Sequence, residues 1–152
     1  MKSIASINFR GGVGKSTVIW LIAKYIAEKL NKRTLVIDID AQMNLTLAVQ
    51  LDDETGLLNK EFGQWYNQHI NSKKNLLNLL ELYEKSSGLF DFSINSSFIY
   101  KMSDNLHFIP STAGLYWLEI DAVDRDKIKD FVKTFLDKLE HTSRYNYDIV
   151  FF

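Results

Sequence analysis

The sequence reads Arg10-Gly11-Gly12-Val13-Gly14-Lys15-Ser16-Thr17 between two segments of contrasting pattern. Residues 3–9 form a short apolar run that predicts a buried strand, and residues 16–30 carry apolar residues at helical spacing. That spacing predicts one buried helix face, formed by Val18, Leu21, Ile22, Tyr25 and Ile26. A strand, a glycine-rich turn and a helix in this order are the context that a phosphate-binding loop requires.

The glycines and the start of the helix are expected to act together on an anion. Glycine lets the backbone curl so that successive N–H groups point at one centre, and the first helical turn adds its own N–H groups. Lys15 brings a positive charge to the β- and γ-phosphates, and the Ser16 hydroxyl is a ligand for Mg²⁺. We therefore expect ATP and Mg²⁺ as cofactors, with the nucleotide held by Gly11, Gly12, Val13, Gly14, Lys15, Ser16 and Thr17. The alternative, a glycine turn that only joins a strand to a helix, is disfavoured because both flanking elements are in place.

Two carboxylates follow the next predicted strand, residues 33–39. Asp38 and Asp40 come at its C-terminal end, the edge where α/β sheets bind ligands, and strand alternation puts both on the same side. Two buried carboxylates so close together are costly unless a cation or water shares them. The pair therefore predicts a site beside Mg²⁺, the alternative being that both aspartates cap the next helix or pair with surface lysines.

The glycine-rich loop departs from the ordinary Walker A pattern at one position, because Phe9 stands where that pattern has its first glycine. It resembles instead the deviant Walker A motif, K-G-G-x-G-K-S/T, of the ParA/MinD family of P-loop ATPases, with Arg10 in place of the signature lysine. In that family the signature lysine reaches across a dimer interface to the partner's nucleotide. The resemblance thus implies a catalytic set of Lys15, Arg10 and Asp40.

The stretch from Val36 to Thr46 is similar to the family's D-x-D-P-Q-G-N-x-T segment. The resemblance implies that Asp40 orients the attacking water and that Asp38 lies near the magnesium shell, which makes Asp38 and Ser16 the metal-site residues. Ala41 replaces the usual proline, and Met43 replaces the usual glycine.

The residues Gln42, Asn44 and Thr46 match the ParA branch, which acts in plasmid or chromosome partitioning. That branch implies an ATP-dependent homodimer, non-specific DNA binding, and hydrolysis stimulated by a ParB-like protein, all in the cytoplasm at the nucleoid. Two alternatives stay open: a MinD-like membrane-associated spatial regulator, and a truncated nucleotide-binding module without hydrolysis. The related nitrogenase iron protein is disfavoured because its cluster needs cysteines and this chain has none.

The rest of the chain alternates between strand and helix patterns. Helices are predicted within residues 61–70, 74–84 and 124–140, strands at 105–109 and 147–152, and a loop or mixed structure at 88–104. The alternation predicts an α/β fold, a parallel P-loop NTPase-type sheet flanked by helices, in one domain over residues 1–152. Residues 147–152 resemble the strand that leads into Walker B, so we expect a partial domain, truncated before the Walker B aspartate.

The composition excludes several other classes of protein. The net charge of −1 and the pI near 6.3 argue against a dedicated nucleic-acid binder, and the absence of cysteine excludes disulfides and thiolate metal sites. The N-terminus lacks the pattern of a signal peptide, and no apolar run approaches the ~20 residues that span a bilayer. His69, His107 and His141 lack the spacing of metal ligands.

Overall fold

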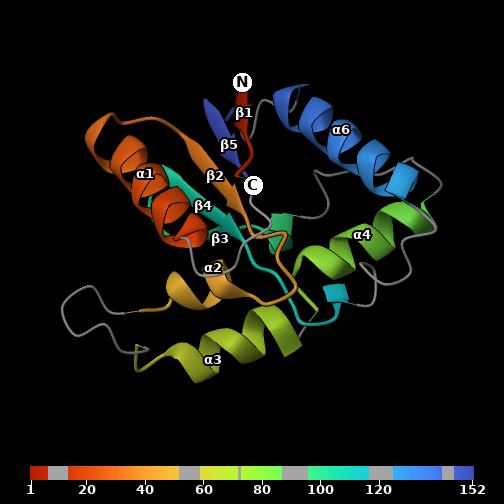
Figure 1. Ribbon diagram of the computed structural model, residues 1–152, viewed down its shortest axis with the longest axis horizontal. Coiled ribbons are helices and arrows are strands. Elements are labelled where there is room, and N and C mark those ends of the chain that lie inside the picture. Colours follow the sequence, from red (N-terminus) through yellow and green to blue (C-terminus); the bar gives the residue numbers. More distant parts are fainter. Residues whose placement is uncertain (7–13, 52–58, 72, 87–95, 117–124, 142–145) are drawn as a thin grey trace.

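The computed structural model describes residues 1–6, 14–51, 59–71, 73–86, 96–116, 125–141 and 146–152. In this part of the chain, a five-stranded sheet carries helices on both faces (Figure 1). The strands are β1 (Lys2–Ile4), β2 (Thr34–Ile37), β3 (Tyr100–Lys101), β4 (Leu106–Ile109) and β5 (Ile149–Phe151). The helices are α1 (Lys15–Lys29), α2 (Asn44–Ala48), α3 (Phe62–Tyr66) with a π-helix (Asn67–Asn71), α4 (Leu76–Lys85), a 3₁₀ turn (Ser96–Phe98) and α6 (Arg125–His141).

The strand order is β1-β5-β2-β4-β3, and every neighbouring pair except the last is parallel. In the centre, Val36 of β2 lies between Phe108 of β4 and Phe151 of β5. This confirms the predicted parallel sheet flanked by helices. The antiparallel strand β3 lies in the stretch predicted as a loop or mixed structure, because a two-residue strand shows no readable alternation.

Alternate residues of the central strands build two apolar cores, one on each face of the sheet. Leu35 and Ile37 point to the face covered by α4 and α6, and Val36 points to the face covered by α1, α2 and α3. Figure 1 shows α1 on one side of the sheet with α4 and α6 on the other. The carboxyl ends of β1, β2 and β5 thus meet at one edge, between these two layers.

The predicted buried face of α1 is wrong. The helix buries Ile19, Ala23 and Ala27, whereas the exposed fractions of Val18 and Leu21 are 53% and 59%. Ile22 and Tyr25 are also exposed, and Ile26 is partly buried against the α1-side core. The small side chains at Ala23 and Ala27 let the helix lie close to the sheet, and this leaves the larger apolar residues outside.

The other predicted helices are present, and the structure adds a π-helical turn after α3 and the short helix α2. Helices α4 and α6 lie where they were predicted, and α6 buries Phe131, Phe135 and Leu139 against the sheet. The helix predicted within residues 61–70 is α3 followed by a π-helical turn. The short helix α2 was not predicted, since five residues are too few to show a helical period.

His107 makes the stability of this fold depend on pH. It is half-buried on β4, with Nδ1 2.6 Å from the Tyr147 hydroxyl oxygen, and burial lowers its pKa below the ordinary 6.5, assisted by the charges of Lys101 and Arg33. As the pH falls below 6.5, the unfolded chain therefore binds a proton at His107 more readily than the folded chain does. The free energy of unfolding falls as the pH falls. We expect His107→Gln to remove this part of the decline, measured by urea unfolding at about pH 7.5 and about pH 5.5.

The exposed histidine on α6 provides the matched control. His141→Gln makes the same replacement at an exposed position away from Tyr147. A His107→Gln variant whose unfolding midpoint still fell by the parental amount would contradict the assignment.

Candidate functional site

The structure describes the last part of the predicted phosphate loop. Arg10, Gly11, Gly12 and Val13 lie outside the described residues, and Gly14 precedes the first residue of α1 with a φ of 80°, in the left-handed region that favours glycine. An ideal Cβ at Gly14 would meet no atom within 4 Å, so the backbone angle, rather than crowding, accounts for the glycine here. As the N-cap, Gly14 has no side chain to cap the N–H groups of the first turn of α1, which suits an anion there.

A cavity of about 300 Å³ lies at the carboxyl edge of the sheet. Lys15 and Ser16 of α1 line it on one side, and Asp38, Asp40 and Gln42 line it from the segment after β2. Its size falls at the lower end of the ~300–1,000 Å³ range of ligand pockets. The structure therefore brings the end of the phosphate loop and both predicted aspartates to one cavity.

Hydrogen bonds hold the carboxylate of Asp38, whose exposed fraction is 3%. Its Oδ2 accepts bonds from the Thr46 N–H at 2.7 Å and the Thr46 hydroxyl at 2.6 Å, and its Oδ1 accepts the Asp40 N–H at 3.1 Å. Burial raises the pKa of Asp38, the three hydrogen bonds oppose this rise, and the neighbouring Asp40 carboxylate adds to it. Asp38 thus fixes the loop after β2, and a cation nearby would favour its ionised form.

Asp40 is more accessible than Asp38 and lies on the loop itself. Its Oδ1 accepts the Gln42 N–H at 2.9 Å, and its Oδ2 accepts the Asn44 side-chain amide at 3.2 Å. Its backbone carbonyl accepts the Met43 N–H at 2.9 Å and the Ser111 hydroxyl at 2.6 Å. Asp40 lines the cavity, and these bonds fix the orientation of both its side chain and its backbone.

Sequence reasoning missed Ser111 as a neighbour of this site. The available signal was its position just after a predicted strand, because the carboxyl ends of parallel strands share one edge of the sheet. The structure places Ser111 against the Asp40 loop.

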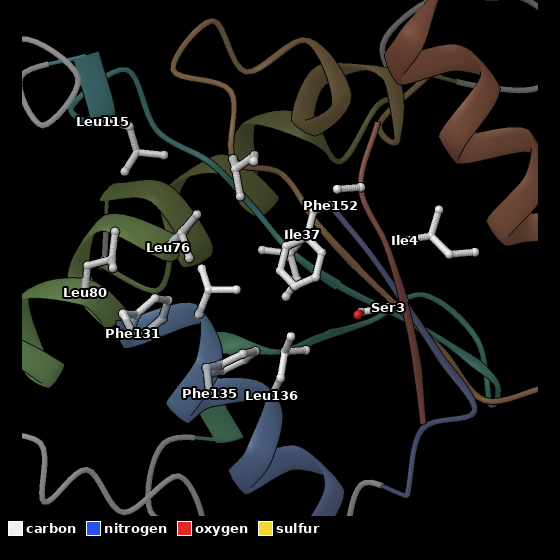
Figure 2. A pocket seen from close by; sticks show the side chains of 13 residues that line it. Ser3, Ile4, Ile37, Leu76, Leu80, Leu115, Phe131, Phe135, Leu136 and Phe152 are labelled. Atoms are coloured by element: carbon white, nitrogen blue, oxygen red, sulfur yellow. The ribbon is translucent and has the colours of Figure 1, made fainter. Parts of the chain in front are cut away.

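A second cavity, of about 520 Å³, opens on the α4 and α6 face of the sheet. Figure 2 shows Phe131, Phe135 and Leu136 of α6 gathered across from Ile37 and Phe152. The described residues that line it include no charged side chain, so they offer phosphate no positive charge. The polar cavity beside Lys15 is the better candidate site, although it is the smaller one.

Magnesium fits the polar cavity through a mixed set of ligands. In the described ranges, no group of three or more histidine, aspartate or glutamate side chains is placed to hold a metal ion. Mg²⁺ needs no such cage, because it keeps several waters and takes its other ligands from phosphate oxygens and one or two side chains. Ser16 and Asp38 line the cavity and can supply that part. None of the described helices combines the length and the apolarity that a membrane crossing needs.

Comparison with known proteins gives matches along the whole chain. Residues 1–152 match the AAA_31 family of AAA domains. The chain is 41% identical over 59 residues to the virulence plasmid ParA family protein pGP5-D of Chlamydia psittaci, which covers 38% of this chain and 23% of that protein. It is 40% identical over 57 residues to the chromosome-partitioning ATPase Soj of Thermus thermophilus, which covers 38% of this chain and 22% of that protein.

Among solved structures, a putative plasmid partition protein of Borrelia burgdorferi bound to AMPPNP is similar, with a TM-score of 0.64 and 26% identity. The match covers 99% of this chain and 52% of that one. The chain thus spans about half the length of this solved relative, and its matches to the curated relatives cover under a quarter of their length.

Proposed function

The chain belongs to the AAA_31 family and is a P-loop ATPase domain of the ParA/MinD type, and we propose that it is part of a ParA-like partitioning ATPase that binds Mg²⁺-ATP in the polar cavity. One observation carries the proposal: the cavity joins Lys15 and Ser16, at the start of α1, to Asp38 and Asp40, after β2. These four residues lie at the edge of the sheet where a nucleotide is expected.

Each residue of the site then has a role. Lys15 would neutralise charge on the β- and γ-phosphates, and the residues from Gly11 to Thr17 are proposed to bind them. Ser16 would hold Mg²⁺, which would supply further positive charge beside the phosphates. Asp40 orients a water for attack, while Asp38 stays beside the metal shell.

Arg10 is proposed to serve in a homodimer rather than in its own cavity. By the resemblance of the loop, it takes the place of the lysine that contacts the partner's nucleotide. A guanidinium keeps the charge and can bind phosphate oxygens in a fork, which a lysine cannot do. The dimer would form only with ATP bound.

The larger function rests on the relatives. Similarity to a plasmid ParA family protein and to a chromosome-partitioning ATPase supports a role in DNA segregation. By the resemblance to the ParA branch, the proposed location is the nucleoid, and the proposed partners are non-specific DNA and a ParB-like stimulating protein. A longer form carrying the second half of such a protein should retain DNA in an ATP-dependent, salt-sensitive way.

The test of the site itself uses the 152-residue chain. A fluorescent ATP analogue, titrated with and without Mg²⁺, should bind saturably, bind more tightly with Mg²⁺, and be displaced by unlabelled ATP. Absence of saturable binding under both conditions would refute the proposal.

Replacing Asp40 should separate binding from hydrolysis. Asp40→Ala is expected to keep the nucleotide affinity of the parent and to slow hydrolysis about 10²-fold or more in a longer, active form, because a group that positions the attacking water is lost. Single-turnover hydrolysis of radiolabelled ATP measures the rate. The matched control is Asp104→Ala, in the turn that precedes β4, which should hydrolyse at the parental rate. Parental hydrolysis by Asp40→Ala would remove Asp40 from the mechanism.

A further inference from the structure

A buried chain of hydrogen bonds ties the end of β4 to the loop that carries both aspartates. Thr46 and Ser111 are fully buried, although they lie 65 positions apart in the sequence. The Ser111 N–H donates to the Thr46 hydroxyl oxygen at 2.8 Å, and the Ser111 hydroxyl donates to the Asp40 carbonyl at 2.6 Å. Ser111 therefore holds one aspartate directly and reaches the other through Thr46.

The Thr46 hydroxyl has the chemistry that this place requires. It donates its single proton to Asp38 Oδ2 at 2.6 Å and accepts the Ser111 N–H on a lone pair. Valine has the same shape and could do neither, so it would leave a buried N–H and a buried carboxylate each short of one partner. Serine would keep both bonds.

We propose that Thr46 and Ser111 are positioning residues, which hold Asp38 and Asp40 in place beside the nucleotide cavity; this rests on the proposed function of that cavity. Neither Thr46 nor Ser111 lines the cavity, whereas both aspartates do. Thr46 and Ser111 act through the aspartates and touch neither nucleotide nor metal. The hydrogen bonds that join Thr46 and Ser111 to Asp38 and Asp40 are called the latch below. Ser111 follows Pro110, whose carbonyl accepts the Leu76 N–H of α4 at 2.9 Å, so the latch is anchored to helix α4.

The first part of the test asks whether the latch holds the loop. Ser111→Ala removes the bond to the Asp40 carbonyl and leaves the bond from the Ser111 N–H. Amide hydrogen exchange of residues 40–43 should become about three- to tenfold faster, the expected effect of losing one neutral hydrogen bond. The matched control is Ser86→Ala, which removes a bond from a serine hydroxyl to the Tyr83 carbonyl at 2.8 Å, away from the site. It should leave the exchange of residues 40–43 unchanged.

The second part asks whether the latch matters to the ligand. Mg²⁺ should raise the affinity of the parent for a fluorescent ATP analogue, and this increase should be about three- to tenfold smaller in Thr46→Val. The affinity measured in EDTA should stay within about twofold of the parent, because Lys15 provides the metal-independent binding. Thr46→Ser should restore the gain. Thr34→Val removes another buried threonine hydroxyl bond, to the Lys32 carbonyl at 3.0 Å, and should change neither affinity.

The outcomes separate this inference from the proposed function. Unchanged hydrogen exchange in Ser111→Ala overturns the latch. Suppose that exchange is faster in Ser111→Ala but that Mg²⁺ raises the nucleotide affinity of Thr46→Val as much as that of the parent. This result overturns the positioning role and leaves nucleotide binding standing. A parent chain that binds no nucleotide overturns the proposed function and this role with it. If Ser111→Ala or Thr46→Val does not fold, Ser111→Cys and Thr46→Ser are measured instead. The weaker thiol donor should give intermediate exchange and the serine parental behaviour, and any other result refutes the latch.

Discussion

Lys15→Ala is expected to lower the affinity of the chain for Mg²⁺-ATP by about 10²-fold or more. The ammonium of Lys15 is the one full positive charge that the described lining of the polar cavity offers to phosphate. Truncating one partner of a close charge pair costs ~2–5 kcal/mol, and each 1.4 kcal/mol is about tenfold in affinity. Equilibrium titration with a fluorescent ATP analogue measures the loss.

Two further variants show whether the loss is one of charge at the right place. Lys15→Gln keeps most of the length of the side chain without its charge and should bind as weakly as Lys15→Ala. Lys29→Ala removes an exposed lysine from the last turn of the same helix and should bind like the parent. Parental affinity in Lys15→Ala would sink the assignment of residues 10–17 as a phosphate loop.

Ala23→Asp is expected to unfold the chain. Ala23 has an exposed fraction of 0% and lies on the face of α1 that packs on the sheet, in the core with Val36 and Phe108. A carboxylate there would be buried without a partner, at a cost of at least ~3–5 kcal/mol, against a total stability of ~5–15 kcal/mol for a typical domain. Circular dichroism and urea unfolding should show a lost or strongly lowered transition.

The control for this prediction lies two residues earlier on the same helix. Leu21→Asp places the same carboxylate where the side chain is 59% exposed, so the urea midpoint should change little. The sequence pattern alone predicts the reverse order, because it places Leu21 on the buried face. A chain destabilised more by Leu21→Asp than by Ala23→Asp would overturn the orientation of α1.

The contrast between Leu21 and Ala23 shows where sequence reasoning stops. Residues 18–23 are apolar without a break, so several faces of the helix satisfy a helical period equally well. The sheet decides between them, since it accepts the face that brings the helix backbone closest. The glycine-rich turn could be predicted, in contrast, because its chemistry is local and Gly14 meets its backbone requirement within one residue.

In the candidate site too, local patterns predict some features, and others depend on how distant strands pair. Asp38 and Asp40 could be predicted because they follow a recognisable strand, and the edge of a parallel sheet collects such residues. The hydrogen bonds from Thr46 and Ser111 could not be predicted, because they depend on the register in which β4 pairs with β2. In that register Ile37 lies beside Ile109. That pairing joins segments far apart in the chain, and no local pattern encodes it.

The outer strand β1 has a consequence for handling the protein. In the described sheet β1 pairs with β5 alone, and Lys2, Ser3 and Ile4 are all exposed. A bare strand edge is a template for another molecule, and natural proteins usually blunt it with charge or cover it. Lys2 is the single charged side chain within β1. Concentrated stocks should therefore lose protein by edge-to-edge precipitation while the fold is still intact, so losses during purification would follow concentration more closely than temperature.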